Sequence, residues 1–364
     1  MNITIVAGAR PNFMKIAPII EAIQNKKKQG FNINYRLIHT GQHYDKNLSS
    51  TFFEELHIPF PNTNLEVKSG TQAEQTAAIM IGFEKELIEN PCDLVMVVGD
   101  VTSTMACTIV AKKAHIKVTH IEAGIRSGDM KMPEEINRIV TDSLTDYFFT
   151  TSTYANENLE KLGFSKSNIF FVGNVMIDTL LKNEARLKKP NLWHDLKLSN
   201  KNYLVMTLHR PSNVDEETQL KSLITHIVSL GKEYPIIFPV HPRTQKLLSA
   251  LNLNFENLHY VNPLGYLEFN YLVKNSLAVI TDSGGITEEA TVMNIPCITL
   301  RDTTERPETC DIGTNVLVGN DSEKIKNNFE ILLSGNWKQG KIPELWDGYA
   351  AERIVNQLIN LFDL

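Results

Sequence analysis

The sequence predicts an α/β protein with two Rossmann-like domains that face a cleft. Short apolar runs of strand length alternate with helix-length amphipathic segments, which is the pattern of parallel sheets covered by helices. The alternation begins at Ile3–Ala7 and begins again at Tyr203–Leu208. The 364 residues also exceed the size at which a single hydrophobic core keeps growing, so two domains are expected.

Composition limits the classes of partner. Hydrophobic residues make up 42% of the chain and charged residues 21%, as in ordinary globular proteins. The formal charge is −6 and no long basic run occurs, which argues against a nucleic-acid partner. No apolar run approaches the ~20 residues that cross a bilayer, and no signal peptide is recognisable, so we expect a cytoplasmic protein without membrane contact.

The four cysteines are scattered and predict free thiols, in keeping with a reducing compartment. No His-x-x-x-His or Cys-rich spacing indicates a metal site. The G-x-G-x-x-G fingerprint of dinucleotide binding is absent, and no cofactor is expected.

In the first half, six strands and the helices between them follow in order. The predicted strands are Ile3–Ala7, Tyr35–His39, Leu94–Val98, Val118–Ile121, Tyr147–Thr151 and Ile169–Val172. The predicted helices are Ile16–Lys26, Ser49–Leu56, Thr71–Asn90, Val101–Ala114, one beginning at Pro133, Ser152–Leu162 and Ile177–Arg186.

Charged residues follow the strands of this half. Asp100 and Glu122 come after two successive parallel strands, and Glu134 lies at the start of a helix. Ligands of doubly wound sheets bind at the carboxyl ends of the strands, so these carboxylates are expected to converge there. Mutual repulsion would then raise their pKa values and make them useful bases. Arg10 and Lys15, in the loop after the first strand, are candidate ligands of an anion.

In the second half the same alternation continues to the C-terminus. The predicted strands are Tyr203–Leu208, Ile236–Val240, Leu258–Val261, Leu277–Thr281 and Pro296–Leu300, and the helices are Glu216–Tyr234, Leu267–Lys274, one after Gly285, and Ala350–Leu361. The polar stretch 188–202 is the candidate linker. The domains are expected at 1–172, with the helix at about 350–364, and at 173–349.

The most informative stretch is Asp282–Glu289, a strand-to-helix turn containing Ser283, Gly284 and Gly285. Free backbone N–H groups at a helix start bind phosphate, and glycines let the phosphate approach closely. Glu289, farther into the helix, would repel phosphate but suits the hydroxyls of a ribose. A nucleoside diphosphate site is therefore predicted, although an ordinary turn would have the same sequence features.

Two histidines also follow strands of this half, His209 before Arg210-Pro211 and His241 before Pro242-Arg243. At a strand end, His209 could transfer a proton or hold a phosphate oxygen. Carboxylates and a histidine with a diphosphate site predict proton transfer on a nucleotide-linked substrate.

Six segments occur in the same order as in one family. They are Gly8-Ala9-Arg10-Pro11…Lys15, Gly99-Asp100, His120-Ile121-Glu122-Ala123-Gly124, Pro133-Glu134-Glu135-Ile136-Asn137-Arg138, Asp282-Ser283-Gly284-Gly285 and Arg301-Asp302-Thr303-Thr304-Glu305-Arg306-Pro307-Glu308. The chain thus resembles the non-hydrolysing UDP-N-acetylglucosamine 2-epimerases over nearly its whole length. This resemblance implies a glycosyltransferase-B type fold, a last helix that crosses back to the first domain, and a homodimer.

The resemblance further implies that UDP-GlcNAc and UDP-ManNAc are interconverted by elimination of UDP to a 2-acetamidoglucal and re-addition. Carried over by position, Asp100, Glu122 and Glu134 match the acid/base carboxylates, and His209 matches the active-site histidine. The remaining matches concern UDP: Arg10 and Lys15 near the diphosphate, Ser283, Gly284 and Gly285 in the phosphate turn, Glu289 at the ribose, Phe269 at the uracil, and Arg301 and Arg306 bordering the cleft.

Two loops depart from the family pattern. Pro211 and Ser212 follow His209-Arg210 where many members have a second Arg and a Glu, and the loop 40–45 lacks the form found in members that a second UDP-GlcNAc activates. Relatives that epimerise other UDP-sugars at C2 have loops like these. UDP-GlcNAc is favoured, with another UDP-N-acetyl sugar, a glycosyltransferase on the same fold and a non-catalytic UDP-sugar sensor as alternatives.

Overall fold

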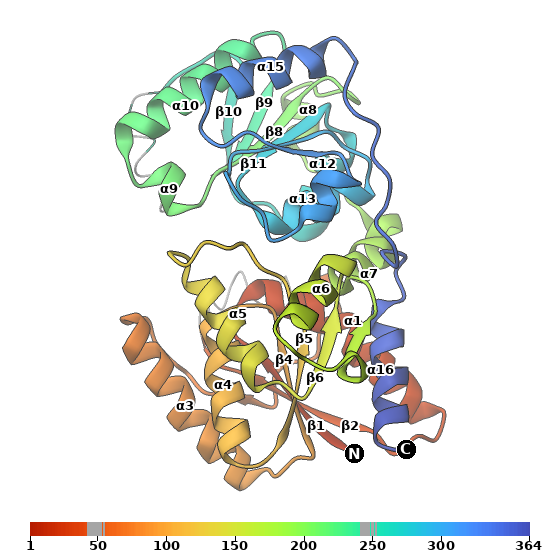
Figure 1. Ribbon diagram of the computed structural model, residues 1–364. Helices are drawn as coiled ribbons and strands as arrows, with labels where there is room; N and C mark the ends of the chain where they lie inside the picture. Colours follow the sequence, from red (N-terminus) through yellow and green to blue (C-terminus); the bar gives the residue numbers. More distant parts are fainter. Residues whose placement is uncertain (42–52, 54, 241–247, 249–250, 252) are drawn as a thin grey trace. The chain divides into compact units, whose positions relative to one another are not determined.

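The computed structural model describes residues 1–41, 53, 55–240, 248, 251 and 253–364. These residues form two compact units, each built on a parallel sheet (Figure 1). Unit 1 comprises residues 1–182 and 344–364, and unit 2 comprises residues 183–343. The α/β architecture with two Rossmann-like units that the sequence predicts is confirmed.

The described part of unit 1 contains a seven-stranded sheet in the order β3-β2-β1-β4-β5-β6-β7. Its first six strands have the 3-2-1-4-5-6 order of the Rossmann fold. The strands are β1 (Asn2–Ala7), β2 (Asn34–His39), β3 (Thr63–Asn64), β4 (Leu94–Val98), β5 (Lys117–Ile121), β6 (Tyr147–Thr150) and β7 (Ile169–Phe171). The helices are α1 (Arg10–Lys28), α3 (Gln72–Glu89), α4 (Thr102–Lys113), α5 (Pro133–Leu144), α6 (Thr153–Lys161), α7 (Val175–Asn183) and α16 (Ala350–Leu361).

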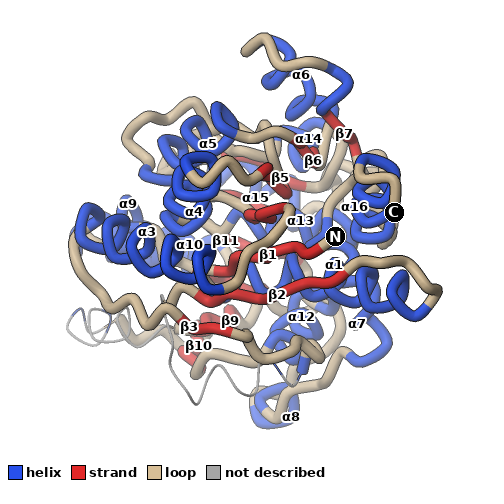
Figure 2. The backbone as a smooth tube through the Cα atoms, turned by 90° about the horizontal axis from the view of Figure 1, so that it is seen from below, coloured by secondary structure: helices blue, strands red, loops and turns tan. Residues whose placement is uncertain are grey.

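Helices cover this sheet in two groups. On one side α3, α4 and α5 lie side by side, while α16 lies against α1 (Figure 2). The C-terminal helix therefore returns to the first unit, as the family resemblance implies. Its apolar stripe explains this packing, since Ile354, Val355 and Leu358 are fully buried.

The described part of unit 2 repeats this order with a six-stranded sheet, β10-β9-β8-β11-β12-β13. The strands are β8 (Leu204–Thr207), β9 (Ile236–Pro239), β10 (Leu258–Val261), β11 (Ala278–Thr281), β12 (Cys297–Thr299) and β13 (Asn315–Leu317). The helices are α8 (Leu192–Asp195), α9 (Pro211–Val214), α10 (Glu217–Leu230), α12 (Tyr266–Asn275), α13 (Gly284–Val292), α14 (Pro307–Asp311) and α15 (Ser322–Leu333).

Several local expectations are wrong. Helix α1 begins at Arg10 rather than Ile16, because Pro11 fits the first turn of a helix and does not break it. The stretch 188–202 is not a linker: Trp193 and Leu198 are buried in a core cluster of unit 2. The predicted helix Ser49–Leu56 lies largely outside the described residues.

The boundary between the units falls after Lys182 rather than Val172. Two side chains of α7 explain why this helix stays with unit 1. Thr179 donates a hydrogen bond to the Met14 carbonyl, at 2.7 Å. Asp178 accepts from the backbone N–H groups of Ala350 and Ala351, at 3.1 and 2.7 Å, and so caps α16.

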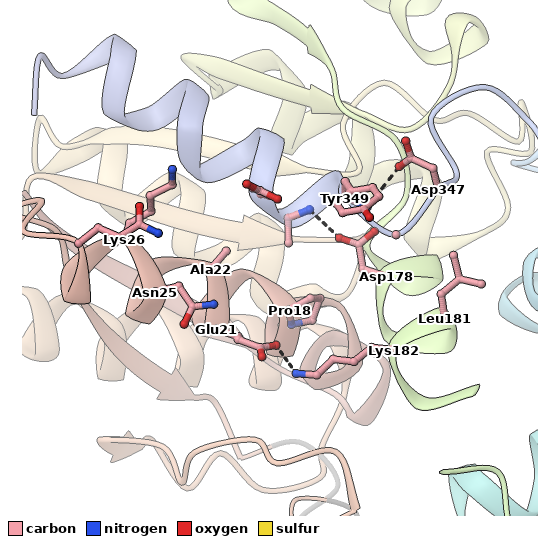
Figure 3. A pocket seen from close by; sticks show the side chains of 14 residues that line it. Pro18, Glu21, Ala22, Asn25, Lys26, Asp178, Leu181, Lys182, Asp347 and Tyr349 are labelled. Atoms are coloured by element: carbon pink, nitrogen blue, oxygen red, sulfur yellow. Dashed lines mark hydrogen bonds and ion pairs between the residues drawn. The ribbon is translucent and has the colours of Figure 1, made fainter. Parts of the chain in front are cut away.

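A pocket of about 430 Å³ lies beside this contact in unit 1. Figure 3 shows it between α1, α7 and the start of α16, with the ion pair of Glu21 and Lys182 at one side. None of the residues that line it is a predicted site residue. No helix in the described part of the chain is both long and apolar enough to cross a membrane.

Candidate active site

The first group of site residues lies at the carboxyl ends of β4 and β5 in unit 1. These strands run in register from Leu94↔Lys117 to Val98↔Ile121, so Asp100 and Glu122 leave the sheet at one edge. This edge is next to the point where the strand order reverses between β1 and β4, which is where ligands of such sheets bind.

Gly99 is the residue around which this group converges. Its φ is +70°, a conformation in which side chains are strained. A Cβ added to it would lie 3.3 Å from Asn12 Nδ2, 3.4 Å from Lys15 Nζ and 3.6 Å from Glu122 Oε2. Asn12 fixes the neighbouring turn, because its Nδ2 donates to the Val98 carbonyl at 2.9 Å while its Oδ1 accepts from the N–H of Gly8.

Each of the two carboxylates here has a cation as its partner. Lys15 Nζ pairs with Glu122 Oε2, and Arg138 donates to Asp100 Oδ2 through Nε at 3.1 Å and through Nη2. The sequence predicted that these carboxylates lie close to one another; it did not predict the cation that the structure places beside each of the two. Glu122 is 1% exposed and has φ of +70°, so this side chain is held at a strained backbone position.

Glu134 lies in the first turn of α5 and is partly exposed. Asn137 and Arg138 lie three and four residues after Glu134, on the same face of α5, and both bond Asp100. Asn137 Nδ2 donates to the Asp100 carbonyl at 2.9 Å. The face of α5 that carries Glu134 therefore lies against Asp100. The Glu134 carboxylate itself makes no hydrogen bond with another described residue.

Its neighbour Glu135 has a structural role. Burial raises the pKa of this carboxyl, but the N–H groups of Ser127 and Gly128 and the Arg138 guanidinium outweigh burial and leave the pKa lowered. Glu135 thereby supports the arginine that holds Asp100.

The second group of site residues lies in unit 2, at the ends of β8 and β11. These strands are paired through Thr207↔Thr281, so His209 and Asp282 follow at one edge, next to the reversal of strand order. Asp282 is fully buried and its Oδ1 lies 2.7 Å from His209 Nδ1. The His209 side chain is 56% exposed, so the carboxylate orients a histidine that solvent and ligand can reach.

Asp282 organises the whole turn after β8. Its carboxylate also accepts from the backbone N–H groups of His209 and Arg210 and from Asn213 Nδ2, at 3.0 to 3.2 Å. Burial raises its pKa, but the bonds from His209, Arg210 and Asn213 lower it more, so Asp282 is held ionised. Sequence reasoning assigned Asp282 no role, although adjacent strands ending in His and Asp are a signal that could have found it.

The predicted phosphate turn starts a helix, as expected. Ser283 is the N-cap residue of α13, and Gly284 and Gly285 form its first turn. The Ser283 hydroxyl makes no capping bond. The backbone N–H of Ser283 donates to Thr281 Oγ1 at 3.0 Å. The start of α13 therefore has the geometry that binds anions at helix N-termini.

Arg301 and Arg306 are both buried and paired. Arg301 donates from Nη1 and Nη2 to the two oxygens of Glu305, each at 2.8 Å, and Arg306 Nε pairs with Glu288 on α13. The Arg306–Glu288 pair fastens the segment that follows β12 to α13. Arg301 Nη1 would lie 3.8 Å from a Cβ on Gly284.

The predicted nucleoside contacts come from two helices that touch. Glu289 on α13 is 4% exposed, and its Oε1 accepts from the Tyr266 hydroxyl at 2.8 Å and from Asn270 Nδ2 at 3.3 Å, both on α12. Phe269 lies between Tyr266 and Asn270 in the sequence of α12. It is partly buried against the unit 2 core cluster that contains Trp193 and Leu198.

Burial raises the pKa of Glu289 to about 7. A carboxyl whose folded pKa lies above its ordinary value of 4.5 favours the folded state at low pH, and that contribution is lost as the pH rises through about 7. We compare the free energy of unfolding of Glu289→Gln with that of the wild type. We expect this difference to shift in favour of the variant by on the order of 3 kcal/mol from pH 5 to pH 8, at ~1.4 kcal/mol per pH unit. Urea unfolding at both pH values, with exposed Glu233→Gln as control, tests this; a gain that is equal at both pH values would contradict it.

Some predicted residues lie outside the described part of the chain. They include His241 and, of the loop 40–45, residues 42–45; for Arg10 only the backbone, which begins α1, is described. Among the described residues no group of three or more histidine, cysteine, aspartate or glutamate side chains could hold a metal ion.

Comparison with known proteins identifies the family of the chain. A family profile described as UDP-N-acetylglucosamine 2-epimerase matches residues 24–359. The UDP-N-acetylglucosamine 2-epimerase of Methanocaldococcus jannaschii is 41% identical, over 98% of this chain and 99% of that protein. The UDP-2,3-diacetamido-2,3-dideoxy-D-glucuronate 2-epimerase of Pseudomonas aeruginosa is 36% identical, over 99% of this chain and all of that one.

A crystal structure of the M. jannaschii UDP-GlcNAc 2-epimerase in complex with UDP-GlcNAc and UDP superposes with a TM-score of 0.88. It is 41% identical, and the match covers 99% of this chain and 100% of that one. The profile alone spans well over half of the sequence. The chain therefore belongs to the UDP-N-acetylglucosamine 2-epimerase family.

Proposed function

We propose that this protein is an isomerase that interconverts UDP-GlcNAc and UDP-ManNAc. The observation that carries the proposal is the pair Asp100 and Glu122, which leave adjacent strands of unit 1 beside Gly99, in a chain of the epimerase family. Two carboxylates at one sheet edge suit a reaction that removes a proton from a carbon and returns it on the other face.

The chemistry follows from the weak acidity of C2, which is not next to a carbonyl group. One carboxylate takes the C2 proton while the C1–O bond breaks and UDP leaves with the electron pair of that bond. The C–H electrons form the C1=C2 double bond of a 2-acetamidoglucal. A proton is then added to C2 from the opposite face, and a UDP oxygen attacks C1. Asp100, Glu122 and Glu134 supply and remove these protons.

The residues of unit 2 must then keep UDP bound between the two halves of the reaction. Ser283, Gly284 and Gly285 bind the diphosphate at the start of α13, with Arg10 and Lys15 as further cations. Glu289 binds the ribose and Phe269 lies at the uracil. His209, oriented by Asp282, holds or protonates a phosphate oxygen of the leaving group.

The same proposal includes the wider setting. The product supplies ManNAc units for a surface polysaccharide, the protein works in the cytoplasm, and it is a homodimer. Support comes from the family match and from the charge and composition of the chain.

A substrate panel tests the proposal against its alternatives. The protein is incubated separately with UDP-GlcNAc and with the UDP-diacetamido sugar of the P. aeruginosa relative, and the sugars are followed by proton NMR. We expect a manno product from UDP-GlcNAc, with the higher kcat/KM. Turnover of the diacetamido sugar alone would favour the other 2-epimerase activity. UDP release only upon addition of a sugar acceptor would indicate a glycosyltransferase.

A further inference from the structure

A fully buried histidine lies beneath the two carboxylates of unit 1. His120 is on β5, two residues before Glu122, and none of its surface is exposed. Its Nδ1 lies 2.7 Å from Asp142 Oδ1, and its Nε2 lies 2.8 Å from the carbonyl oxygen of Gly99. The proposed proton transfers do not use it, because Asp142 and Gly99 occupy both of its ring nitrogens.

Both neighbours of the ring are acceptors. Burial raises the pKa of Asp142, but His120 and Arg126 outweigh burial and leave the pKa lowered, so this partner is a carboxylate. A carbonyl oxygen can only accept. The geometry therefore fits a ring that donates from both nitrogens, with Asp142 as its buried partner.

This pair touches both turns that carry the carboxylates. His120 binds the carbonyl of Gly99, the residue before Asp100. Asp142 Oδ2 accepts from the backbone N–H of Gly124, two residues after Glu122, at 3.1 Å, and pairs with Arg126 Nη1 at 2.7 Å. The ends of β4 and β5 are thus joined through one histidine and one aspartate.

These two turns need support from side chains, because their backbone conformations are not held by the usual preference for negative φ. Gly99, Glu122 and Gly124 all have positive φ, at 70°, 70° and 79°. A trans peptide directs its C=O and N–H to opposite sides, so the bond at the Gly99 carbonyl also sets the orientation of the Asp100 N–H.

We propose that the His120–Asp142 pair is a positioning device that sets the placement of Asp100 relative to Glu122 for proton transfer at C2. This role rests on the proposed epimerase activity. Both residues are fully buried, and they act through the backbone of Gly99, one residue before Asp100, and of Gly124, two residues after Glu122. A displacement of about 1 Å at such a group can cost about 100-fold in rate, which is the scale of effect expected here.

Two substitutions of the histidine separate its two contacts. His120→Gln keeps a donor near the position of Nε2, toward Gly99, and His120→Asn keeps a donor near Nδ1, toward Asp142. We expect His120→Asn to lower kcat about 100-fold and His120→Gln about 10-fold, with KM for UDP-GlcNAc and UDP affinity close to wild type. The exposed His115→Asn is the matched control, since its φ of 58° suits asparagine.

In D2O the variants should also change the ratio of C2 deuterium in recovered substrate to that in product. Loss of stability alone would not alter this ratio. If both His120 variants fail to fold, Asp142→Asn decides, with exposed Asp363→Asn as control. The proposal would be overturned by a folded His120→Asn or Asp142→Asn protein that has the kcat and the deuterium ratio of the wild type.

An imidazole 15N spectrum of the wild-type protein tests the geometry without any activity. We expect both ring nitrogens of His120 to be protonated at pH 7.5. A neutral ring would overturn the proposal, whereas an inactive wild-type protein with the charged ring would refute the epimerase activity alone.

Discussion

Asp100→Asn is expected to lower turnover of UDP-GlcNAc at least ~100-fold while leaving UDP affinity unchanged. Asparagine has nearly the same shape and can still accept the bond from Arg138, but it can neither take up nor release a proton. Because Asp100 is not among the residues proposed to bind UDP, the affinity for UDP should not depend on it. Steady-state kinetics and calorimetric titration with UDP measure the two quantities.

The matched control is Asp363→Asn, the same substitution at an exposed position of unit 1. It should leave kcat as in the wild type. An Asp100→Asn protein that is folded, binds UDP and turns over at a near-normal rate would exclude Asp100 from the acid/base chemistry. A loss of UDP binding in the same protein would instead indicate that Asp100 contributes to nucleotide binding.

Asp282→Asn is expected to lower turnover by up to about 10⁴-fold, the loss found when a carboxylate that orients a catalytic histidine is replaced by an amide. The substituted amide cannot accept from His209 Nδ1, the two backbone N–H groups and Asn213 together, as the carboxylate does. Leaving buried donors unpaired costs about 1–3 kcal/mol, so the turn after β8 should also lose stability.

A double-mutant cycle shows whether His209 and Asp282 act as one unit. We expect His209→Asn combined with Asp282→Asn to be no slower than His209→Asn alone, because the aspartate acts through the histidine. Losses in kcat that multiply would show that the two residues act independently. Asp195→Asn, exposed in the same unit, controls for the loss of a charge.

The strand ends could be predicted because buried parallel strands are nearly continuous apolar runs. The runs before Gly99 and Glu122 locate two of the proposed acid/base carboxylates, and the run before Asp282 locates the predicted phosphate turn. The restart of the strand–helix alternation at Tyr203 was enough to predict two Rossmann-like units. The last helix was predicted from its amphipathic pattern, while its return to unit 1 was expected from the family resemblance.

Pairing between side chains could not be predicted in the same way. Arg301 and Arg306 look like anion ligands in the sequence, but each has a carboxylate partner, Glu305 and Glu288, and the second pair joins separate elements. Similarly, Lys15 was expected at a diphosphate and is paired with Glu122, more than a hundred residues away. Local sequence does not encode such long-range neighbours.

The short elements were missed for a different reason. β13 and α14 have only three and five residues, too few for a periodic pattern, and 188–202 is polar overall although Trp193 is buried in it. One large apolar residue among polar ones can anchor a segment to a core without changing its average composition.

The central claim is that the C2–H bond of a UDP-linked sugar breaks and re-forms on this protein. The direct measurement is proton NMR of UDP-GlcNAc incubated with the enzyme in D2O. We predict that the C2 proton signal disappears as deuterium enters from solvent, and that a manno sugar deuterated at C2 accumulates without net release of UDP. A manno product that retains protium at C2, or a substrate left unchanged, would contradict the account.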